Sequence, residues 1–128
     1  MSHPLLTRLT DEMGWPHLGD ADALAAHLAR PGLHCLFIPG DPARNLETGD
    51  AAVILPELQK AFEGRFDCAL VGDAIEAGLR ETTRVLKTPG FLFYDGDRFL
   101  GGIAKIRDWD DYMGRVPQIL PTPAESDA

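Results

Sequence analysis

The most informative stretch of the sequence is Thr88-Pro89-Gly90-Phe91-Leu92-Phe93-Tyr94-Asp95-Gly96-Asp97. Its apolar centre is typical of a strand, and Asp95-Gly96-Asp97 is a strong hairpin signal because Asp-Gly suits the backbone of tight turns. The turn leads into a second strand-like segment, residues 98–104. The stretch therefore predicts an antiparallel hairpin with a Thr-Pro turn directly before its first strand.

Upstream of the hairpin, strand-like and helix-like segments alternate. Residues 33–38 and 66–71 are compact apolar runs that suit strands buried on both faces. Residues 15–18 suit a short edge strand or an extended segment, because Pro16 is best tolerated at an edge. Caps and apolar periodicity predict helices over residues 4–13, from Asp20 or Asp22 to about Arg30, from Asp50 to about Gly64 with Pro56 inside, and from Asp73 to about Thr83.

Periodicity also predicts which side chains of these helices face the core. They are Leu24, Ala25 and Leu28 in the second helix, and Ile54, Leu55, Leu58 and Phe62 in the third. Gly101-Gly102, in the second hairpin strand, indicates a bulge or a point of close packing.

A last helix is predicted to start after Asp108 as N-cap, with Asp111 completing an acidic variant of the capping box. Its apolar stripe consists of Trp109, Tyr112, Met113 and Val116, and Trp109 is expected in the core. Pro117 is expected to end it.

The order of elements is α-β-α-β-α-β-α-β-β-α. The early strands should be parallel, with right-handed crossovers, and the hairpin adds an antiparallel edge. We expect one α/β domain over residues 1–120, with a mixed central sheet, helices on both faces and a C-terminal hairpin and helix. Residues 121–128 are Pro-rich, small and acidic, and we expect a disordered acidic tail.

Composition narrows the classes of partner. The chain has 128 residues, of which 45% are hydrophobic, and a formal net charge of −8. This charge argues against nucleic acid or anionic membranes as partners and is compatible with a basic one. No apolar run is long enough to span a bilayer, and the N-terminus does not resemble a secretory signal, so we expect a cytoplasmic protein without membrane insertion.

The chain resembles thioredoxins over about residues 15–116. The matching features are a helix with an internal proline (Pro56), Thr88-Pro89 before a strand, and the hairpin followed by a helix carrying Trp109. The resemblance implies a thioredoxin-like fold with a cis peptide bond before Pro89. It also places Thr48-Gly49-Asp50-Ala51 where thioredoxins carry Cys-Gly-Pro-Cys, so the two sulfurs that dithiol exchange requires are absent there.

The whole sequence more closely resembles the HyaE/HupG family of hydrogenase accessory proteins, which are thioredoxin-like and lack the cysteine pair. The residues that carry this resemblance are Gly14-Trp15-Pro16, His34–Asp41, Val53–Leu58, Pro89–Gly96, Gly101-Gly102-Ile103 and Arg107-Asp108-Trp109. The resemblance implies a non-enzymatic chaperone in nickel–iron uptake hydrogenase maturation. Its implied partner is the hydrogenase small subunit precursor, bound through its twin-arginine signal peptide. Other hydrogenase accessory proteins are further candidate partners.

A receptor for such a peptide needs carboxylates beside an apolar or backbone-pairing groove, because arginine forms charge-assisted bonds with carboxylates. Asp41, Glu47 and Asp50 lie in or next to the loop of residues 39–49, which should adjoin Thr88 and Pro89. These five residues are the predicted peptide site, with the Thr88 backbone pairing with an extended peptide. Simpler roles stay open: Asp41 starting a turn before Pro42, Asp50 capping a helix and Glu47 as a solvated charge.

Other chemistry has weaker support. Cys35 and Cys68 are expected to be buried free thiols. No pair among the four His residues and two Cys residues has metal-ligand spacing, and His34 and Cys35 should face opposite sides of their strand. We therefore expect no metal, no cofactor and no catalytic residue. Two alternatives remain: an adaptor that binds a folded surface in a maturation complex, and a single-cysteine thiol oxidoreductase.

Overall fold

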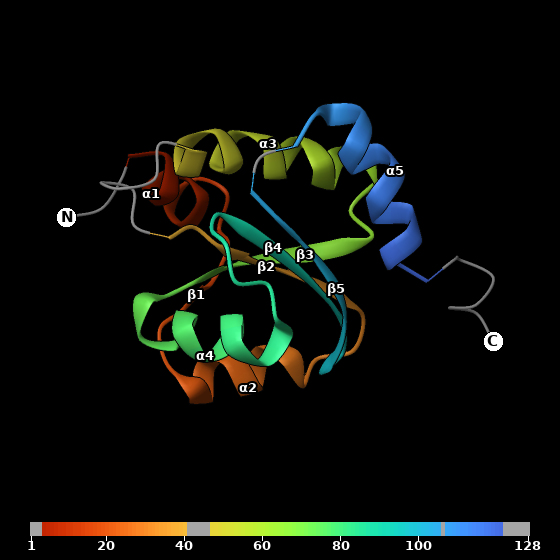
Figure 1. Ribbon diagram of the computed structural model, residues 1–128. Coiled ribbons are helices and arrows are strands. Elements are labelled where there is room, and N and C mark those ends of the chain that lie inside the picture. The colour runs from red at the N-terminus through yellow and green to blue at the C-terminus, as the bar shows by residue number, and fades with distance from the viewer. Residues whose placement is uncertain (1–3, 41–46, 106, 122–128) are drawn as a thin grey trace.

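The computed structural model describes residues 4–40, 47–105 and 107–121 (Figure 1). Its helices are α1 (Pro4–Asp11), α2 (Ala21–Leu28), α3 (Glu47–Ala61), α4 (Asp73–Thr83) and α5 (Trp109–Ile119). Its strands are β1 (His17–Leu18), β2 (Leu33–Ile38), β3 (Phe66–Val71), β4 (Gly90–Asp95) and β5 (Arg98–Ala104). The predicted order of elements is confirmed. The boundary predicted between residues 120 and 121 stays a prediction, because residues 122–128 lie outside the described ranges.

The described strands form one mixed sheet in the order β1-β3-β2-β4-β5. β1, β3 and β2 are parallel, whereas β4 runs antiparallel to both β2 and β5. The short strand β1 lies at the edge, as Pro16 predicted. The hairpin turn at Gly96 adopts a positive φ of 59°, and the Thr88-Pro89 peptide bond is cis.

Helices cover both faces of the sheet (Figure 1). α1, α3 and α5 pack on one face, over a core that contains Cys35, Phe37, Cys68 and Phe93. α2 and α4 pack on the other face, over Leu36, Ala69 and Leu92 among others. Neighbouring residues of each central strand therefore enter opposite cores, which explains why β2 and β3 are apolar runs rather than alternating ones.

Helix starts were predicted with mixed success. Asp20 caps α2, accepting a hydrogen bond of 2.8 Å from the Ala23 backbone N–H. The prediction that Asp73 caps α4 is wrong, since Gly72 holds that position and Asp73 is the first helical residue. Asp50 is not a cap either. α3 begins at Glu47, three residues earlier than predicted. Asp50 lies inside its first turn, where a carboxylate still interacts favourably with the helix dipole.

Two inward-facing assignments need correction. Ala25 is exposed, and the buried side chains of α2 are His27 and Leu28. In α5 only Tyr112 and Val116 are buried, whereas Trp109 is 44% exposed and Met113 37% exposed. The prediction that Trp109 lies in the core is wrong, because α5 contacts the sheet along a narrower stripe than its apolar residues span.

The end of the last helix also differs. Pro117 lies inside α5, which continues to Ile119. A proline removes only its own N–H donor, and the next turn still closes, with the Leu120 N–H donating to the Val116 carbonyl at 2.9 Å. Asp108 is the N-cap residue as predicted, but its side chain makes no capping bond, and Asp111 binds Arg115 instead at 2.9 Å.

The Gly101-Gly102 pair is a point of close packing. A Cβ atom on Gly102 would lie 2.6 Å from Val85 Cγ2 and 3.1 Å from the Phe91 carbonyl oxygen. The register of β4 against β5 also shifts next to this pair, between Phe93 and Tyr94. The close-packing interpretation of the glycines is therefore confirmed, whereas the register irregularity falls on the adjacent Leu100.

Candidate functional site

The loop after β2 and the turn before β4 meet at one end of the sheet. A Cβ atom on Gly40 would lie 2.5 Å from the Thr88 hydroxyl oxygen, so only a glycine allows this approach. The Lys105 N–H donates a hydrogen bond of 2.7 Å to the Pro89 carbonyl oxygen. We call the area formed by Gly40, Glu47, Thr88, Pro89 and Lys105 the Pro89 surface. The predicted adjacency of the loop and the Thr-Pro turn is confirmed.

Thr48 anchors the first turn of α3 beneath this surface. The residue is fully buried, and its hydroxyl donates a hydrogen bond of 2.7 Å to the Pro39 carbonyl oxygen. In the resemblance to thioredoxins, Thr48 stands where the first cysteine of the redox pair would be. Because the Thr48 hydroxyl binds a backbone carbonyl, the residue at this position stabilises the fold. The same hydrogen bond explains why α3 starts earlier than its acidic residues suggested.

The predicted peptide-site residues differ in accessibility. Asp41 lies outside the described residues. Glu47 is half-buried and forms an ion pair with Lys105, with a distance of 3.2 Å between Oε1 and Nζ. Asp50 is exposed, Thr88 is half-buried, and Pro89 is buried. The structure thus brings Glu47, Thr88 and Pro89 together at the Pro89 surface and leaves Asp50 at the solvent-facing side of the first turn of α3.

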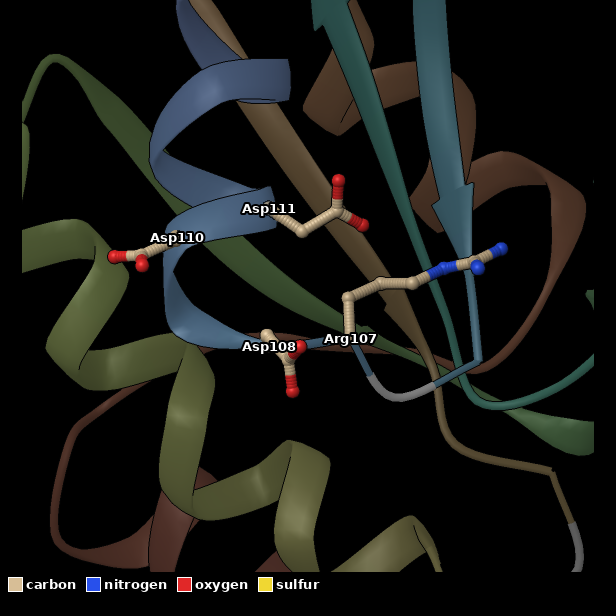
Figure 2. A pocket seen from close by; sticks show the side chains of 4 residues that line it. All are labelled: Arg107, Asp108, Asp110 and Asp111. Carbon is tan, nitrogen blue, oxygen red and sulfur yellow. The ribbon is translucent and has the colours of Figure 1, made fainter.

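An open pocket lies at the start of α5, two residues after Lys105, and its lining consists of Arg107, Asp108, Asp110 and Asp111 (Figure 2). We call it the α5 pocket. The side chains of Asp110 and Asp111 point to opposite sides of the helix start, as Figure 2 shows. Asp111 is paired with Arg115. Asp108 and Asp110 are exposed and form no ion pair with any residue in the described ranges.

Sequence reasoning treated Asp108 and Asp111 only as capping residues, did not consider Asp110 and missed the pocket. The available signal was their density, three carboxylates within the four residues that start at Asp108. Acidic residues in a first helical turn are common, because they interact favourably with the helix dipole.

Tyr112 connects the α5 pocket to the Pro89 surface. Its hydroxyl accepts a hydrogen bond of 3.1 Å from the Arg107 N–H and donates one of 3.4 Å to the Lys105 carbonyl oxygen. Burial raises the pKa of the Tyr112 phenol, which keeps the hydroxyl protonated and able to donate. Tyr112 therefore binds the backbone of Lys105, just after β5, and that of Arg107, just before α5.

Cys35 and Cys68 are buried free thiols, as predicted, and are register partners on β2 and β3. Burial raises the pKa of the Cys35 thiol well above its usual range, and the hydrogen bond with Cys68 raises it further. Since the thiolate is the reactive form, this position disfavours nucleophilic chemistry at Cys35.

Three residues that the sequence did not connect meet on the other face of the sheet. His27 of α2, His34 of β2 and Asp67 of β3 place one ligand atom each within 4.8 Å of one another. His34 and Cys35 do face opposite sides of β2, as predicted. We call the three residues the His27 cluster.

The fold makes this chain a thioredoxin-like protein that lacks the redox cysteine pair. Solved thioredoxins share the fold at low identity: that of Halobacterium salinarum has a TM-score of 0.64 with 9% identity, over 84% of this chain and 91% of its own. That of Plasmodium falciparum has a TM-score of 0.63 with 11% identity, over 83% of this chain and 99% of its own.

The chain belongs to the HyaE family, whose model, the hydrogenase-1 expression protein HyaE, matches residues 5–112. It is 68% identical to the hydrogenase expression/formation protein HupG of Rhodobacter capsulatus, over 93% of this chain and 86% of that protein. It is 42% identical to the hydrogenase expression/formation protein HoxO of Azotobacter vinelandii, over 94% of this chain and 80% of that protein. A crystal structure of a HupG from Rhodopseudomonas palustris matches with a TM-score of 0.54 and 36% identity, over 88% of this chain and 97% of that one.

These relatives make the chain a hydrogenase expression or formation protein, an accessory role, and confirm the family expected from the sequence. No helix within the described residues is both long enough and apolar enough to cross a membrane.

Proposed function

We propose that this protein is a non-redox chaperone of nickel–iron uptake hydrogenase maturation that binds the twin-arginine signal peptide of the small subunit precursor. The observation that carries the proposal is the exposure of two carboxylates of the α5 pocket, Asp108 and Asp110, at the start of a helix that Tyr112 links to Lys105 of the Pro89 surface. The family membership supplies the hydrogenase context. Binding precedes export, so the proposed location is the cytoplasm.

Arginine is the ligand that suits these carboxylates. Its guanidinium is planar, always charged and able to form two parallel bonds with one carboxylate. Asp108 and Asp110 are exposed, and so is Asp50 on α3. Glu47 is a weaker candidate, because an incoming arginine must compete with Lys105 at 3.2 Å. The net charge of −8 further favours the approach of a basic segment.

An apolar element accompanies the charges. Trp109 and Met113 lie one helical turn apart on α5, and both are exposed. Trp109 belongs to the same helix start as Asp108 and Asp110, so this apolar pair is the proposed contact for the apolar residues that follow the arginines of the peptide. A twin-arginine signal has this composition, with a basic segment followed by an apolar one, and a large aromatic surface contributes strongly to binding.

The Thr88-Pro89 turn is the proposed contact for the peptide backbone. Thr88 already interacts with another group of the chain. An extended peptide that pairs with its backbone must therefore share or exchange that interaction, and the carboxylates are expected to provide most of the specificity. Asp41 keeps its place in the proposal as a residue of the adjoining loop.

The proposal includes no catalytic step. Thr48 occupies the place of a redox cysteine and bonds to Pro39, and Cys35 is buried with a raised pKa. A single-cysteine thiol oxidoreductase would need an accessible cysteine with a lowered pKa.

The test is calorimetric titration of the full chain with the small-subunit signal peptide. The protein variants are Asp108→Asn/Asp110→Asn and, as a matched control, Asp22→Asn/Asp73→Asn, which removes two exposed first-turn aspartates from the opposite face. We expect salt-sensitive binding that weakens at least about tenfold in the first variant only. A peptide with both arginines changed to lysine should also bind weakly.

Two results would redirect the proposal. Equal binding by both double variants would exclude the α5 pocket as the arginine site. Failure of the intact peptide to bind, together with binding of a mature small subunit that lacks the signal, would replace signal recognition with the adaptor role.

A further inference from the structure

The His27 cluster lies on the α2 and α4 face of the sheet, away from the core that α1, α3 and α5 cover. His34 Nδ1 lies 2.9 Å from both carboxylate oxygens of Asp67, its register partner on β3. His27 Nε2 lies 3.1 Å from Asp67 Oδ1. The two imidazole rings are tilted against each other, with centroids 4.9 Å apart. The Asp67 carboxylate thus lies within hydrogen-bonding distance of one nitrogen from each imidazole.

The surroundings fix the orientation of His34. The ring is 1% exposed, and its Nε2–H donates a hydrogen bond of 2.9 Å to the Arg30 carbonyl oxygen. That bond directs Nδ1 toward Asp67, whose carboxylate oxygens accept its hydrogen bond, so a metal ion that binds Nδ1 replaces this proton and releases it to solvent. A histidine whose outer nitrogen donates to a backbone carbonyl is the usual arrangement around a bound metal ion, because the bond orients the ring and increases its basicity as a ligand.

His27 is also suited to a ligand role. It is buried at the C-terminal end of α2, and burial is the main cause that lowers its pKa below the ordinary value of 6.5. Its Nε2 faces the Asp67 carboxylate oxygen rather than solvent, which is the position a ligand atom requires. Its Nδ1 lies 3.4 Å from the Arg30 guanidinium.

Arg30 supplies the cation that the cluster now contacts. Its Nη2 lies 3.5 Å from Asp67 Oδ2, and its side chain is 58% exposed. Such a side chain can move into solvent without opening a core. The Asp67 side chain is 36% exposed, so that movement leaves a path from solvent to the carboxylate.

We propose that His27 Nε2, His34 Nδ1 and the Asp67 carboxylate form a binding site for one divalent metal ion of the zinc type, with Arg30 as the competing cation. Two histidines and a carboxylate are a known ligand set for Zn²⁺ when the fourth position holds water. Tetrahedral ligands at about 2.0–2.2 Å from zinc lie about 3.3 Å apart. On metal binding, the distances of 2.9–3.1 Å from the two imidazole nitrogens to the Asp67 carboxylate would increase slightly. No two of the three ligand atoms start more than 4.8 Å apart.

This site differs from the proposed peptide site in position and chemistry, and neither depends on the other. The sequence did not indicate it because the ligands come from three elements, and His34 and Asp67 are 33 positions apart in the chain. Only the parallel pairing of β2 and β3 makes those two residues neighbours.

The test is titration of the tag-free full chain with Zn²⁺ in competition with a chromophoric chelator. We expect one zinc ion per chain. Asp67→Asn and His27→Gln should each weaken binding at least about tenfold. Arg30→Gln should strengthen it about fivefold, because it removes the competing charge. His17→Gln, which changes an exposed histidine of β1, should leave the affinity unchanged.

A spectroscopic readout on the unaltered protein guards against variants that fail to fold. Long-range nitrogen–proton NMR spectra of the imidazoles should show Zn²⁺ shifting His27 Nε2 and His34 Nδ1 while the His17 signals stay in place. Absence of saturable binding, unchanged His27 and His34 signals, or weaker binding by Arg30→Gln would overturn the proposal and leave the cluster as a hydrogen-bonded network only.

Discussion

The buried hydroxyl of Thr48 donates its 2.7 Å hydrogen bond to the carbonyl oxygen of Pro39, joining the first turn of α3 to the end of β2. We predict that Thr48→Val lowers the free energy of unfolding by about 1–3 kcal/mol, because the isosteric side chain leaves a buried carbonyl unpaired. Urea denaturation measures the loss. Thr48→Ser keeps the hydroxyl and should be more stable than the Val variant, although it buries less apolar surface.

Gly102 is predicted to be the glycine of β5 that tolerates substitution least. A Cβ atom there would lie 2.6 Å from Val85 Cγ2, so Gly102→Ala should destabilise the protein by about 1–3 kcal/mol through overpacking. Gly78→Ala is the control. Gly78 lies inside α4 with open space around its Cβ direction, and alanine there should stabilise by about 0.5–1 kcal/mol. Opposite shifts in thermal midpoint are expected, and two shifts of the same sign would contradict the packing argument.

His27 should make stability depend on pH. Its pKa is lowered in the folded state, mainly by burial, while Asp67 opposes that shift and His34 and Arg30 add to it. Below about pH 6.5 the unfolded chain binds more protons at this residue than the folded chain does, so stability falls as the pH falls through this range. Urea denaturation at pH 7.5 and 5.5 should show a smaller difference for His27→Gln than for His17→Gln. An equal difference would assign the pH dependence to other groups.

Trp109 offers an optical test of peptide binding. The chain contains two tryptophans, and Trp15 is buried whereas Trp109 is 44% exposed. In a Trp15→Phe variant, the signal peptide should shift the emission of Trp109 to shorter wavelength, because the indole loses water contact. Trp109→Ala should weaken binding and change stability little. Unshifted emission at saturating peptide would place the apolar segment of the peptide elsewhere.

Both cysteines should resist modification in the folded protein. Cys35 and Cys68 are buried, and burial and their mutual hydrogen bond raise the pKa of Cys35. In denaturant at pH 7.5, a chromogenic disulfide reagent should react with both thiols within minutes. In native buffer at the same pH, it should react with neither thiol over the same time. Rapid labelling of one native thiol would revive the thiol oxidoreductase alternative.

The elements that sequence reasoning predicted well are those with a local cause. β2 and β3 are short apolar runs, and the Asp95-Gly96-Asp97 turn specifies its own hairpin, so their positions required no tertiary information. The fold and the family followed from recognisable residues, above all the prolines at positions 56 and 89.

Errors arose where tertiary contacts decide between equally good local choices. Asp50 and Asp73 are both adequate caps by residue type, yet α3 begins earlier because Thr48 bonds to Pro39, and Gly72 precedes Asp73 at the start of α4. The apolar stripe of α5 is real, but only packing determines which half of it is buried. The α5 pocket and the His27 cluster were invisible for the same reason, since neither is defined by spacing along the chain.

The edges of the sheet have a consequence for a protein proposed to handle extended, partly apolar peptides. One edge strand, β1, has only two residues, and at the other edge β5 has a register irregularity against β4. Short and irregular edges are poor templates for adding further strands. An extended segment bound by the proposed chaperone therefore finds little continuous backbone on which to extend the sheet, which disfavours co-aggregation of the two chains.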